Sequence, residues 1–347
     1  MDILHCKKPE AHERVKAMLK SGTIMIAWRK LSRRSILLSR ATNTNLHFFK
    51  DRIPYAKAII QTFFAAQREK SKILIVQLPQ GPLLLEAIIL RRLLGCKVVA
   101  DVHTGFLLSE DWKGRLLNAP FVGLLDKVDL ILAHNKIQLN LIPEKLWSKT
   151  RVVYDPWPFI QNSRATKANS KYIVFPASFA TDEPIKEVIQ AIEASDVHLK
   201  MYITGNYKRQ RDLTKLASNR IIFTGYLADE DFNRLLAGAT AIIAGTKREY
   251  TTLMSAWEAV AYNKPLALTA TSTLKSIFKD YAIFYYWKSS QSIVKAIEKT
   301  VESKPNIDAH EEMKKLVMTS VKILRESLLR LMNSQSIRYS FKHKKSY

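Results

Sequence analysis

Two apolar segments of the sequence end in polar residues that could handle a proton. Asp101 and His103 close the first segment, and His134 and Asn135 follow the second. Histidine titrates near neutral pH and can move a proton, and a carboxylate beside it can orient its ring. His103 is therefore the best candidate for proton transfer, with Asp101 as its support. When each segment is taken alone, a histidine that caps a loop is the favoured alternative for the first, and local hydrogen bonding within a loop is the favoured alternative for the second.

A later loop and the helix after it combine basic and hydroxyl side chains in a way that suits a diphosphate. The loop follows an apolar run and supplies Lys247, Arg248, Thr251 and Thr252. We expect the helix to begin at about Thr251, so that its free N–H groups and its dipole add to the site. Glu258 lies about two turns further on, where a buried carboxylate needs partners such as ribose hydroxyls. The alternative is an ordinary amphipathic helix with Glu258 exposed.

A third segment could also approach a phosphate. Thr204 and Gly205 end an apolar run, and Lys208 follows them. Glycine lets a ligand come close to the backbone, and a lysine can bind phosphate oxygens. This segment is too short to identify a ligand by itself.

Short apolar runs alternate with helical segments along most of the chain. Alternation of this kind is typical of parallel sheets that are buried on both faces. We predict an α/β protein with two Rossmann-like, doubly wound domains that face a central cleft, where strand ends and helix N-termini bind ligands.

The predicted boundaries follow from changes in composition. The N-terminal domain is expected over residues 1–158 and the C-terminal domain over 171–305, separated by a linker over 155–171 that is rich in proline, asparagine and serine. Residues 306–347 should form a helix and a basic tail that could cross back to the first domain. Within the first domain, helices are predicted over 10–20 and 138–147.

The charge of the chain points to a polyanionic partner. Its 347 residues include 55 Lys plus Arg and 31 Asp plus Glu, a net charge of +24. The stripe from Arg29 to Arg34, next to Trp28, would suit a phosphate-rich surface. A solvated basic face is the equally weighted alternative.

The same sequence excludes other classes of protein. Two cysteines cannot build a disulfide framework or a cysteine-rich zinc site. No apolar run reaches the roughly 20 residues that span a bilayer, and the first residues do not read as a signal peptide. We expect a cytoplasmic protein that meets a membrane from its surface, at the inner face of the cell membrane.

In their order and spacing, these segments resemble the GT-B glycosyltransferases, specifically family 4 or group 1. The likeness spans about residues 20–305. In that family, two glutamates of one C-terminal segment contact the nucleotide sugar. The second of them falls on Glu258, and Ala259, Lys264 and Pro265 match the family residues that follow it. Further segments resemble a subgroup of the family: Gln77-Leu78-Pro79, Asp101-Val102-His103, His134-Asn135, Asp155-Pro156, Asp182-Glu183-Pro184 and Thr204-Gly205.

Three positions depart from the family pattern. The first glutamate of the pair falls on Tyr250, and Glu249 stands one residue earlier. The arginine and lysine that hold the donor diphosphate fall near Ser178 and Glu183, neither of which is basic. Glu249 could take over support of the reacting sugar through a bulge, and Lys247, Arg248 or Lys208 could replace the missing cations.

The resemblance implies transfer of a sugar from a nucleoside diphosphate sugar, with retention of anomeric configuration and with no obligatory metal or other cofactor. The donor would lie on the C-terminal domain, with its ribose on Glu258. The acceptor, lipid-linked or another glycan, would lie near His103, with His134 and Asn135 contacting it. The basic N-terminal region further suggests an anionic membrane surface as a partner.

Three other functions fit the same residues. The charge also permits a GT-B enzyme that acts on nucleic acid. The departures at Tyr250, Ser178 and Glu183 would suit a non-catalytic GT-B-like partner protein. A sugar-nucleotide epimerase would share the architecture but needs a carboxylate and histidine set that the sequence does not reveal.

Overall fold

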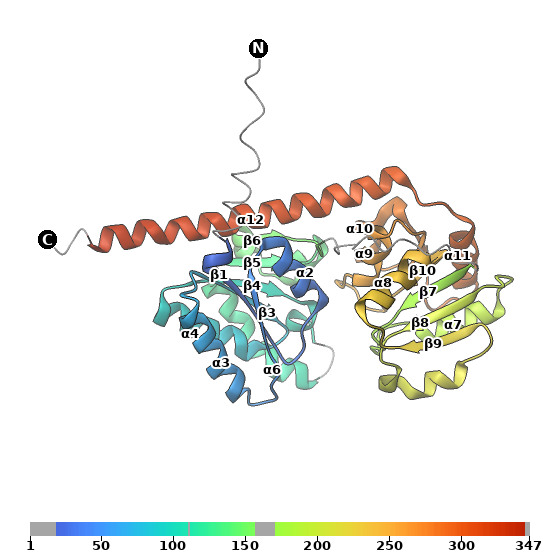
Figure 1. Ribbon diagram of the computed structural model, residues 1–347, viewed down its shortest axis with the longest axis horizontal. Helices are drawn as coiled ribbons and strands as arrows, with labels where there is room; N and C mark the ends of the chain where they lie inside the picture. The colour runs from blue at the N-terminus through green and yellow to red at the C-terminus, as the bar shows by residue number, and fades with distance from the viewer. Residues whose placement is uncertain (1–18, 110–111, 157–170, 344–347) are drawn as a thin grey trace, which may run out of the picture. The chain divides into compact units, whose positions relative to one another are not determined.

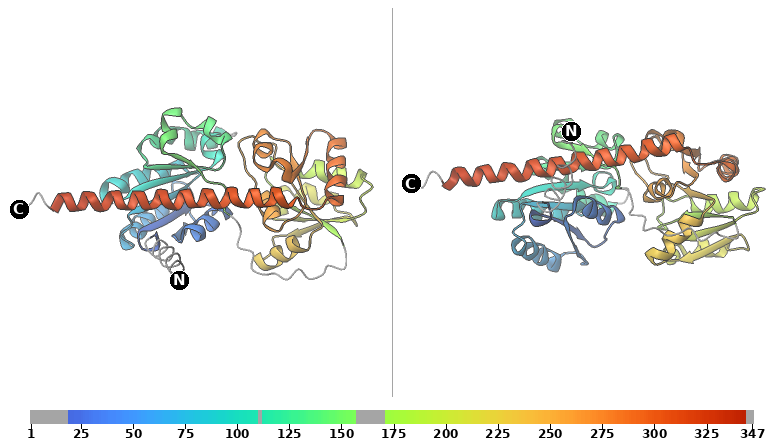
Figure 2. Two further views of the ribbon diagram at one scale, coloured as in Figure 1. Left: turned by 90° about the horizontal axis from the view of Figure 1, so that it is seen from above. Right: turned by 45° about the horizontal axis from the view of Figure 1, so that its top comes forward.

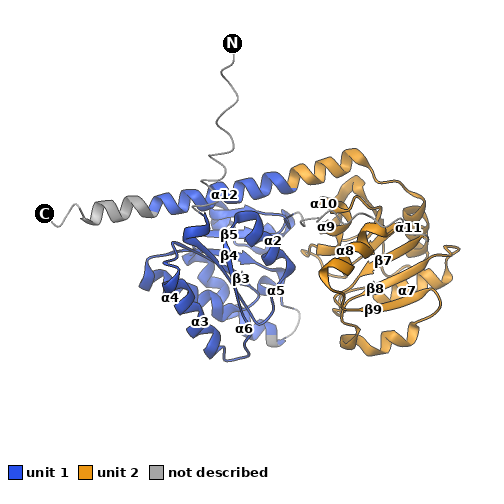
Figure 3. Ribbon diagram, in the orientation of Figure 1, with its two compact units in different colours: residues 1–156, 317–347 blue, residues 157–316 orange. Residues whose placement is uncertain are grey.

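The computed structural model describes residues 19–109, 112–156 and 171–343. The chain divides into two compact units, one of residues Met1–Pro156 with Val317–Tyr347 and one of residues Trp157–Leu316 (Figure 3). No helix in the described ranges is long and apolar enough to cross a membrane.

The N-terminal unit is built on a six-stranded parallel sheet in the order β2-β1-β3-β4-β5-β6 (Figure 1). Mostly apolar runs make four of these strands, and nearly all of their residues are buried. This is the pattern of a sheet covered on both faces. The strands are β1 (Thr23–Trp28), β2 (Asn45–Phe49), β3 (Ile73–Leu78), β4 (Lys97–Val102), β5 (Leu130–Ala133) and β6 (Thr150–Val152).

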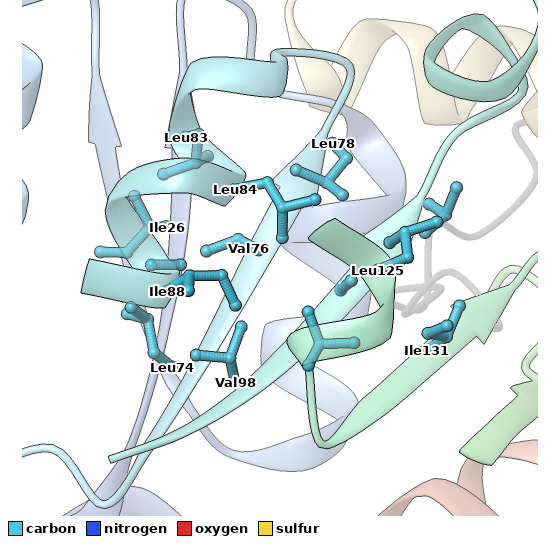
Figure 4. Close-up of a cluster of buried hydrophobic side chains, with 14 of the residues drawn as sticks. Ile26, Leu74, Val76, Leu78, Leu83, Leu84, Ile88, Val98, Leu125 and Ile131 are labelled. Carbon is cyan, nitrogen blue, oxygen red and sulfur yellow. The ribbon is translucent and has the colours of Figure 1, made fainter. Parts of the chain in front are cut away.

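The helices of this unit lie in two layers. They are α2 (Arg33–Thr42), α3 (Ala56–Arg68), α4 (Gly81–Leu94), α5 (Thr104–Leu107) and α6 (Trp112–Val122), with short 3-10 turns η1 (Gly123–Lys127), η2 (Ile137–Leu141) and η3 (Glu144–Lys149). One core cluster joins α3, α4 and η1 to the sheet. In it Leu83, Leu84 and Ile88 of α4 pack over Val76 and Val98 (Figure 4).

The long helix α12 (Ile307–His343) covers the other face of this sheet together with α2 (Figures 1 and 2). Leu324 and Leu328 of α12 share a second core cluster with Leu38, Ile75 and Val99. Burying these side chains between the sheet and the helix fixes the C-terminal segment to the first unit.

The second unit repeats the architecture with the strand order β12-β11-β10-β7-β8-β9. Its strands are β7 (Tyr172–Pro176), β8 (Lys200–Thr204), β9 (Ile221–Gly225), β10 (Ala241–Ala244), β11 (Leu266–Thr269) and β12 (Ala282–Tyr285). Its helices are α7 (Ile185–Ala194), η4 (Tyr207–Leu216), α8 (Asp229–Gly238), α9 (Met254–Ala261), α10 (Ser272–Phe278), η5 (Lys279–Tyr281) and α11 (Ser290–Glu302). The predicted α/β fold with two doubly wound parallel sheets is confirmed.

Two predicted helices differ from the structure. Residues 138–147 form the turns η2 and η3 in place of one α-helix, because Pro143 between them has no N–H to donate. The helix expected from Thr251 begins at Met254, since Tyr250 adopts a left-handed backbone with φ 61° and the next three residues are not helical. Most of the predicted helix 10–20 and most of the predicted linker lie outside the described residues.

Candidate functional site

Asp101, His103 and His134 come together at the carboxyl edge of the N-terminal sheet. Asp101 is in β4, His103 follows that strand, and His134 follows the neighbouring β5. Asp101 is fully buried, and its carboxylate oxygens lie 3.6 Å from His103 Nε2 and 3.5 Å from His134 Nε2. The two imidazole rings meet edge to face with their centroids 4.7 Å apart. The two histidine segments singled out in the sequence therefore form one cluster.

A residue that the sequence analysis placed elsewhere completes this cluster. Arg34, near the start of α2, donates from Nε and Nη2 to Asp101 Oδ1 at 3.1 and 3.0 Å and from Nη1 to Asp155 Oδ1 at 2.8 Å. Its side chain is only 4% exposed. Trp28 is buried as well, and its Nε1 donates to Thr62. The prediction that Arg34 belongs to a surface stripe was wrong, because its guanidinium is buried against the carboxylates of Asp101 and Asp155.

The charges of the cluster and its burial set the protonation of Asp101 and His134. Burial alone would raise the pKa of Asp101, but the Arg34 guanidinium and the two histidines outweigh burial and hold that pKa well below its usual value. Burial lowers the pKa of His134 to about 4, and the Arg34 charge acts in the same direction. At neutral pH the cluster thus holds an ionised Asp101 beside a neutral His134.

His103 is the member of the cluster that solvent can reach. Its side chain is 22% exposed, against 10% for His134. With Nε2 facing the Asp101 carboxylate, the other ring nitrogen is left to accept or donate a proton elsewhere. The geometry suits a histidine that is oriented by a carboxylate and presented to a ligand.

Asn135 shapes the turn behind these histidines. It is fully buried, and its Oδ1 accepts a hydrogen bond from the Gln138 backbone N–H. The Gln138 side chain in turn accepts from the His134 N–H and donates to the Val102 carbonyl. Gln138, which the sequence analysis did not single out, thereby ties the ends of β4 and β5 together.

Asp101, His103 and His134 also offer three possible metal ligand atoms within 4.8 Å of one another. However, Arg34 Nε and Nη2 donate to Asp101, Nε reaching both of its oxygens, and the buried guanidinium charge opposes a cation at this place. The residues present therefore fit a metal poorly, and the expectation of no metal stays a prediction.

In the second unit, the loops after β7 and β10 meet where the strand order reverses, a place where sheets of this kind bind ligands. Thr246 Oγ1 donates to Asp182 at 2.5 Å, and the Lys247 N–H donates to the Asp182 carbonyl. Lys247 Nζ lies 2.7 Å from Glu187, and Arg248 lies 3.9 Å from Asp182. Both predicted phosphate-binding cations thus have carboxylate neighbours within the unit.

Glu249 lies at the N-terminus of α10. Its carboxylate accepts hydrogen bonds from the backbone N–H groups of Ser272 and Thr273 and from the Thr273 hydroxyl. These bonds stabilise the helix start, where anionic side chains are favoured. Tyr250, which occupies the family's first glutamate position, donates its N–H to Thr273 Oγ1.

Glu258 lies in α9, four residues after the helix begins, and is 3% exposed. Thr251 and Thr252 precede the helix as part of the loop, and the Thr251 hydroxyl donates to the Glu249 carbonyl. Leu253, the N-cap residue of α9, has no side-chain acceptor for the first N–H groups. The start of α9 can therefore offer backbone donors to a ligand.

Thr204 is the last residue of β8, and Gly205 follows it at the carboxyl edge of the sheet in the second unit. Gly205 has φ 107°, and a Cβ there would lie 2.0 Å from the Ala177 carbonyl oxygen, so only glycine fits. Lys208 is exposed. Its neighbour Arg209, also exposed, donates from Nη1 to the Ser178 carbonyl at 3.0 Å. Arg209 thus brings a positive charge next to Ser178.

A family model described as "Glycosyl transferases group 1" matches residues 158–317. This part of the chain is similar to the group 1 glycosyltransferases. The resemblance stated from the sequence is thereby confirmed, and the matched segment contains the loop after β10 and helix α9 with Glu258. No curated protein sequence gives a significant match to the chain.

Solved structures of glycosyltransferases share the fold over about nine tenths of the chain. HepE (Alr3699) from Anabaena, in complex with UDP and glucose, is 13% identical with a TM-score of 0.70, over 88% of this chain and 98% of that chain. The lipopolysaccharide outer core galactosyltransferase WaaB is 13% identical with a TM-score of 0.59, over 90% and 99%.

The UDP-forming α,α-trehalose-phosphate synthase from Burkholderia xenovorans is 10% identical with a TM-score of 0.64, over 90% of this chain and 100% of that chain. At these identities the likeness concerns the fold. The predicted GT-B fold is confirmed.

Proposed function

We propose that this glycosyltransferase moves a hexose from a nucleoside diphosphate sugar to a lipid-linked or other glycan acceptor, with retention of anomeric configuration. The buried carboxylate of Glu258 near the start of α9, inside the segment that matches the family, is the observation that carries the proposal. UDP is the first nucleotide to test, because HepE was solved with UDP.

In this proposal the second unit binds the donor. Glu258 accepts hydrogen bonds from the ribose hydroxyls, for which a buried carboxylate is well suited. The first N–H groups of α9 and the Thr251 and Thr252 hydroxyls bind the diphosphate. Arg209 supplies the positive charge near Ser178, and Lys208 and Arg248 are further cations of the same unit. Neither a metal nor another cofactor is required, because helix N–H groups and basic side chains stabilise the leaving diphosphate.

The first unit binds the acceptor. His103, held against Asp101, positions the acceptor hydroxyl and handles its proton, while Arg34 keeps Asp101 ionised. His134 packs edge to face against His103, and Asn135, which is fully buried, shapes the turn after His134 and does not itself reach the acceptor. We place the protein in the cytoplasm, at the inner face of the cell membrane, where a lipid-linked acceptor would be found.

The test is a thermal-shift panel of nucleoside diphosphates and sugar nucleotides. One nucleotide should raise the melting temperature of the wild type, and Glu258→Gln should blunt that shift. If no nucleotide stabilises the protein, the proposal is wrong.

A non-catalytic GT-B-like protein is the second candidate, because the carboxylate of Glu249 binds the start of α10 and Lys247 pairs with Glu187. That protein would bind a nucleotide sugar but release no nucleoside diphosphate over hours with any acceptor. Release of a nucleoside diphosphate from the nucleotide sugar would support the enzyme.

A further inference from the structure

Three neighbouring helices form the outer layer on one side of the N-terminal unit. Helix α4 contacts both α3 and α6, and all three follow strands of the same sheet (Figure 1). Their inner sides, such as Ala58 of α3 and Leu84 of α4, belong to the core beneath them. The opposite sides of α3, α4 and α6 therefore face away from the sheet; we refer to them together as the outer face.

Each of the three helices presents a pair of large apolar side chains on the outer face. The pairs are Ile60 with Phe64, Ile89 with Leu93, and Trp112 with Leu116, and these six side chains are 48 to 70% exposed. Residues four apart lie on the same side of a helix. A solvent-facing helix side is normally polar, and single exposed apolar residues need no explanation, but pairs on three adjacent helices form a patch that calls for a partner.

The exposed charged residues within these three helices are basic. Lys57, Arg68, Arg92 and Arg115 are exposed on the same three helices. Glu86 is the one acidic residue in the three helix sequences, and it is buried. Burial raises the pKa of Glu86 to about 8, so this carboxyl is neutral at pH 7. At neutral pH the helices thus add only positive charge to the apolar patch.

The apolar pairs together with the positive charge favour one kind of partner over another. A second copy of the chain, paired through the same face, would bring like charges together around the contact. An anionic bilayer satisfies both features, because the headgroup–acyl boundary accepts apolar side chains and anionic headgroups attract lysine and arginine.

We propose that the outer face of α3, α4 and α6 docks on an anionic lipid bilayer. The apolar pairs enter the boundary between headgroups and acyl chains, and the four basic residues contact the headgroups around them. The inference rests on the lipid-linked acceptor of the proposed function and gives the surface by which the protein would reach it.

Vesicle flotation with the full-length protein tests this. Vesicles of phosphatidylcholine alone are compared with vesicles that also contain phosphatidylglycerol. We expect the wild type to float with the anionic vesicles and at least tenfold less with the neutral ones. A Phe64→Ser, Leu93→Ser double variant should lose at least tenfold of the bound fraction, and Lys57→Gln with Arg92→Gln should lose a similar amount at low salt.

The matched control replaces two equally exposed apolar residues elsewhere, Ile307 and Met318, with serine. This control should float like the wild type. Equal binding of the double variant and the wild type, or equal flotation with neutral and anionic vesicles, overturns the proposal. The proposal is also overturned if light scattering shows that the wild type is a dimer and the double variant is a monomer, because the outer face would then join two copies of the chain. The nucleotide thermal shift of each variant, measured separately, reports on the donor site and should remain unchanged.

Discussion

Arg34 and Asp101 form a buried ion pair that joins the start of α2 to the end of β4. The guanidinium donates to Asp101 at 3.0 to 3.3 Å and also reaches Asp155 at 2.8 Å. The guanidinium charge compensates two carboxylates, whose ionised forms are costly to bury without a cation. The pair thereby supports the carboxylate that lies against His103.

Replacing Arg34 with methionine should strongly destabilise the N-terminal unit. The change leaves two buried carboxylates without their cation, and breaking such a pair costs roughly 3–5 kcal/mol. Urea unfolding followed by tryptophan fluorescence measures the loss. The matched control is Arg234→Met, which removes an exposed pair with Asp231 and should cost less than about 1 kcal/mol. Equal small losses in both variants would contradict a buried ion pair.

Stability should fall between pH 6.5 and 4 because of His134. Its folded pKa of about 4 lies below the unfolded value, which is roughly 6.5. The unfolded chain therefore binds more protons in this window, so the contribution is complete above about pH 6.5 and is lost as the pH falls, by about 3 kcal/mol. His134→Gln should flatten this part of the curve. An unchanged pH profile in His134→Gln would rule out the buried neutral imidazole.

Gly205→Ala should destabilise the second unit by about 2–4 kcal/mol, because a Cβ at φ 107° would lie 2.0 Å from the Ala177 carbonyl oxygen. Gly105→Ala is the control, since no atom lies within 4 Å of its added Cβ. That change should be neutral or slightly stabilising, as expected for glycine to alanine in a helix. The difference between the two melting temperatures is the measurement.

His103→Asn should separate binding from transfer. If His103 handles the acceptor proton, the variant keeps the nucleotide thermal shift of the wild type and loses about 10²–10⁴-fold in kcat. Donor turnover with a lipid-linked acceptor measures the loss. A variant that keeps full kcat would remove His103 from the mechanism.

The strands could be predicted because fully apolar runs such as 130–133 and 241–244 leave few alternatives to a buried parallel strand. Residues that depend on distant partners could not. Arg34 is buried against carboxylates 67 and 121 positions away, and Lys247 contacts Glu187 only because the first turn of α7 lies beside the loop after β10. The start of α9 was missed because the left-handed backbone of Tyr250 has no signature in a non-glycine residue. Glu258 was expected to be buried, and it is.

Isothermal titration of UDP into the wild type and into Glu258→Gln tests the central claim most directly. Glu230→Gln, an exposed glutamate of α8, is the control. The account predicts that Glu258→Gln weakens the Kd of the nucleotide at least tenfold, about 1.4 kcal/mol, while Glu230→Gln leaves it unchanged. Equal affinity in Glu258→Gln and the wild type, with both proteins folded, would contradict a donor site at α9.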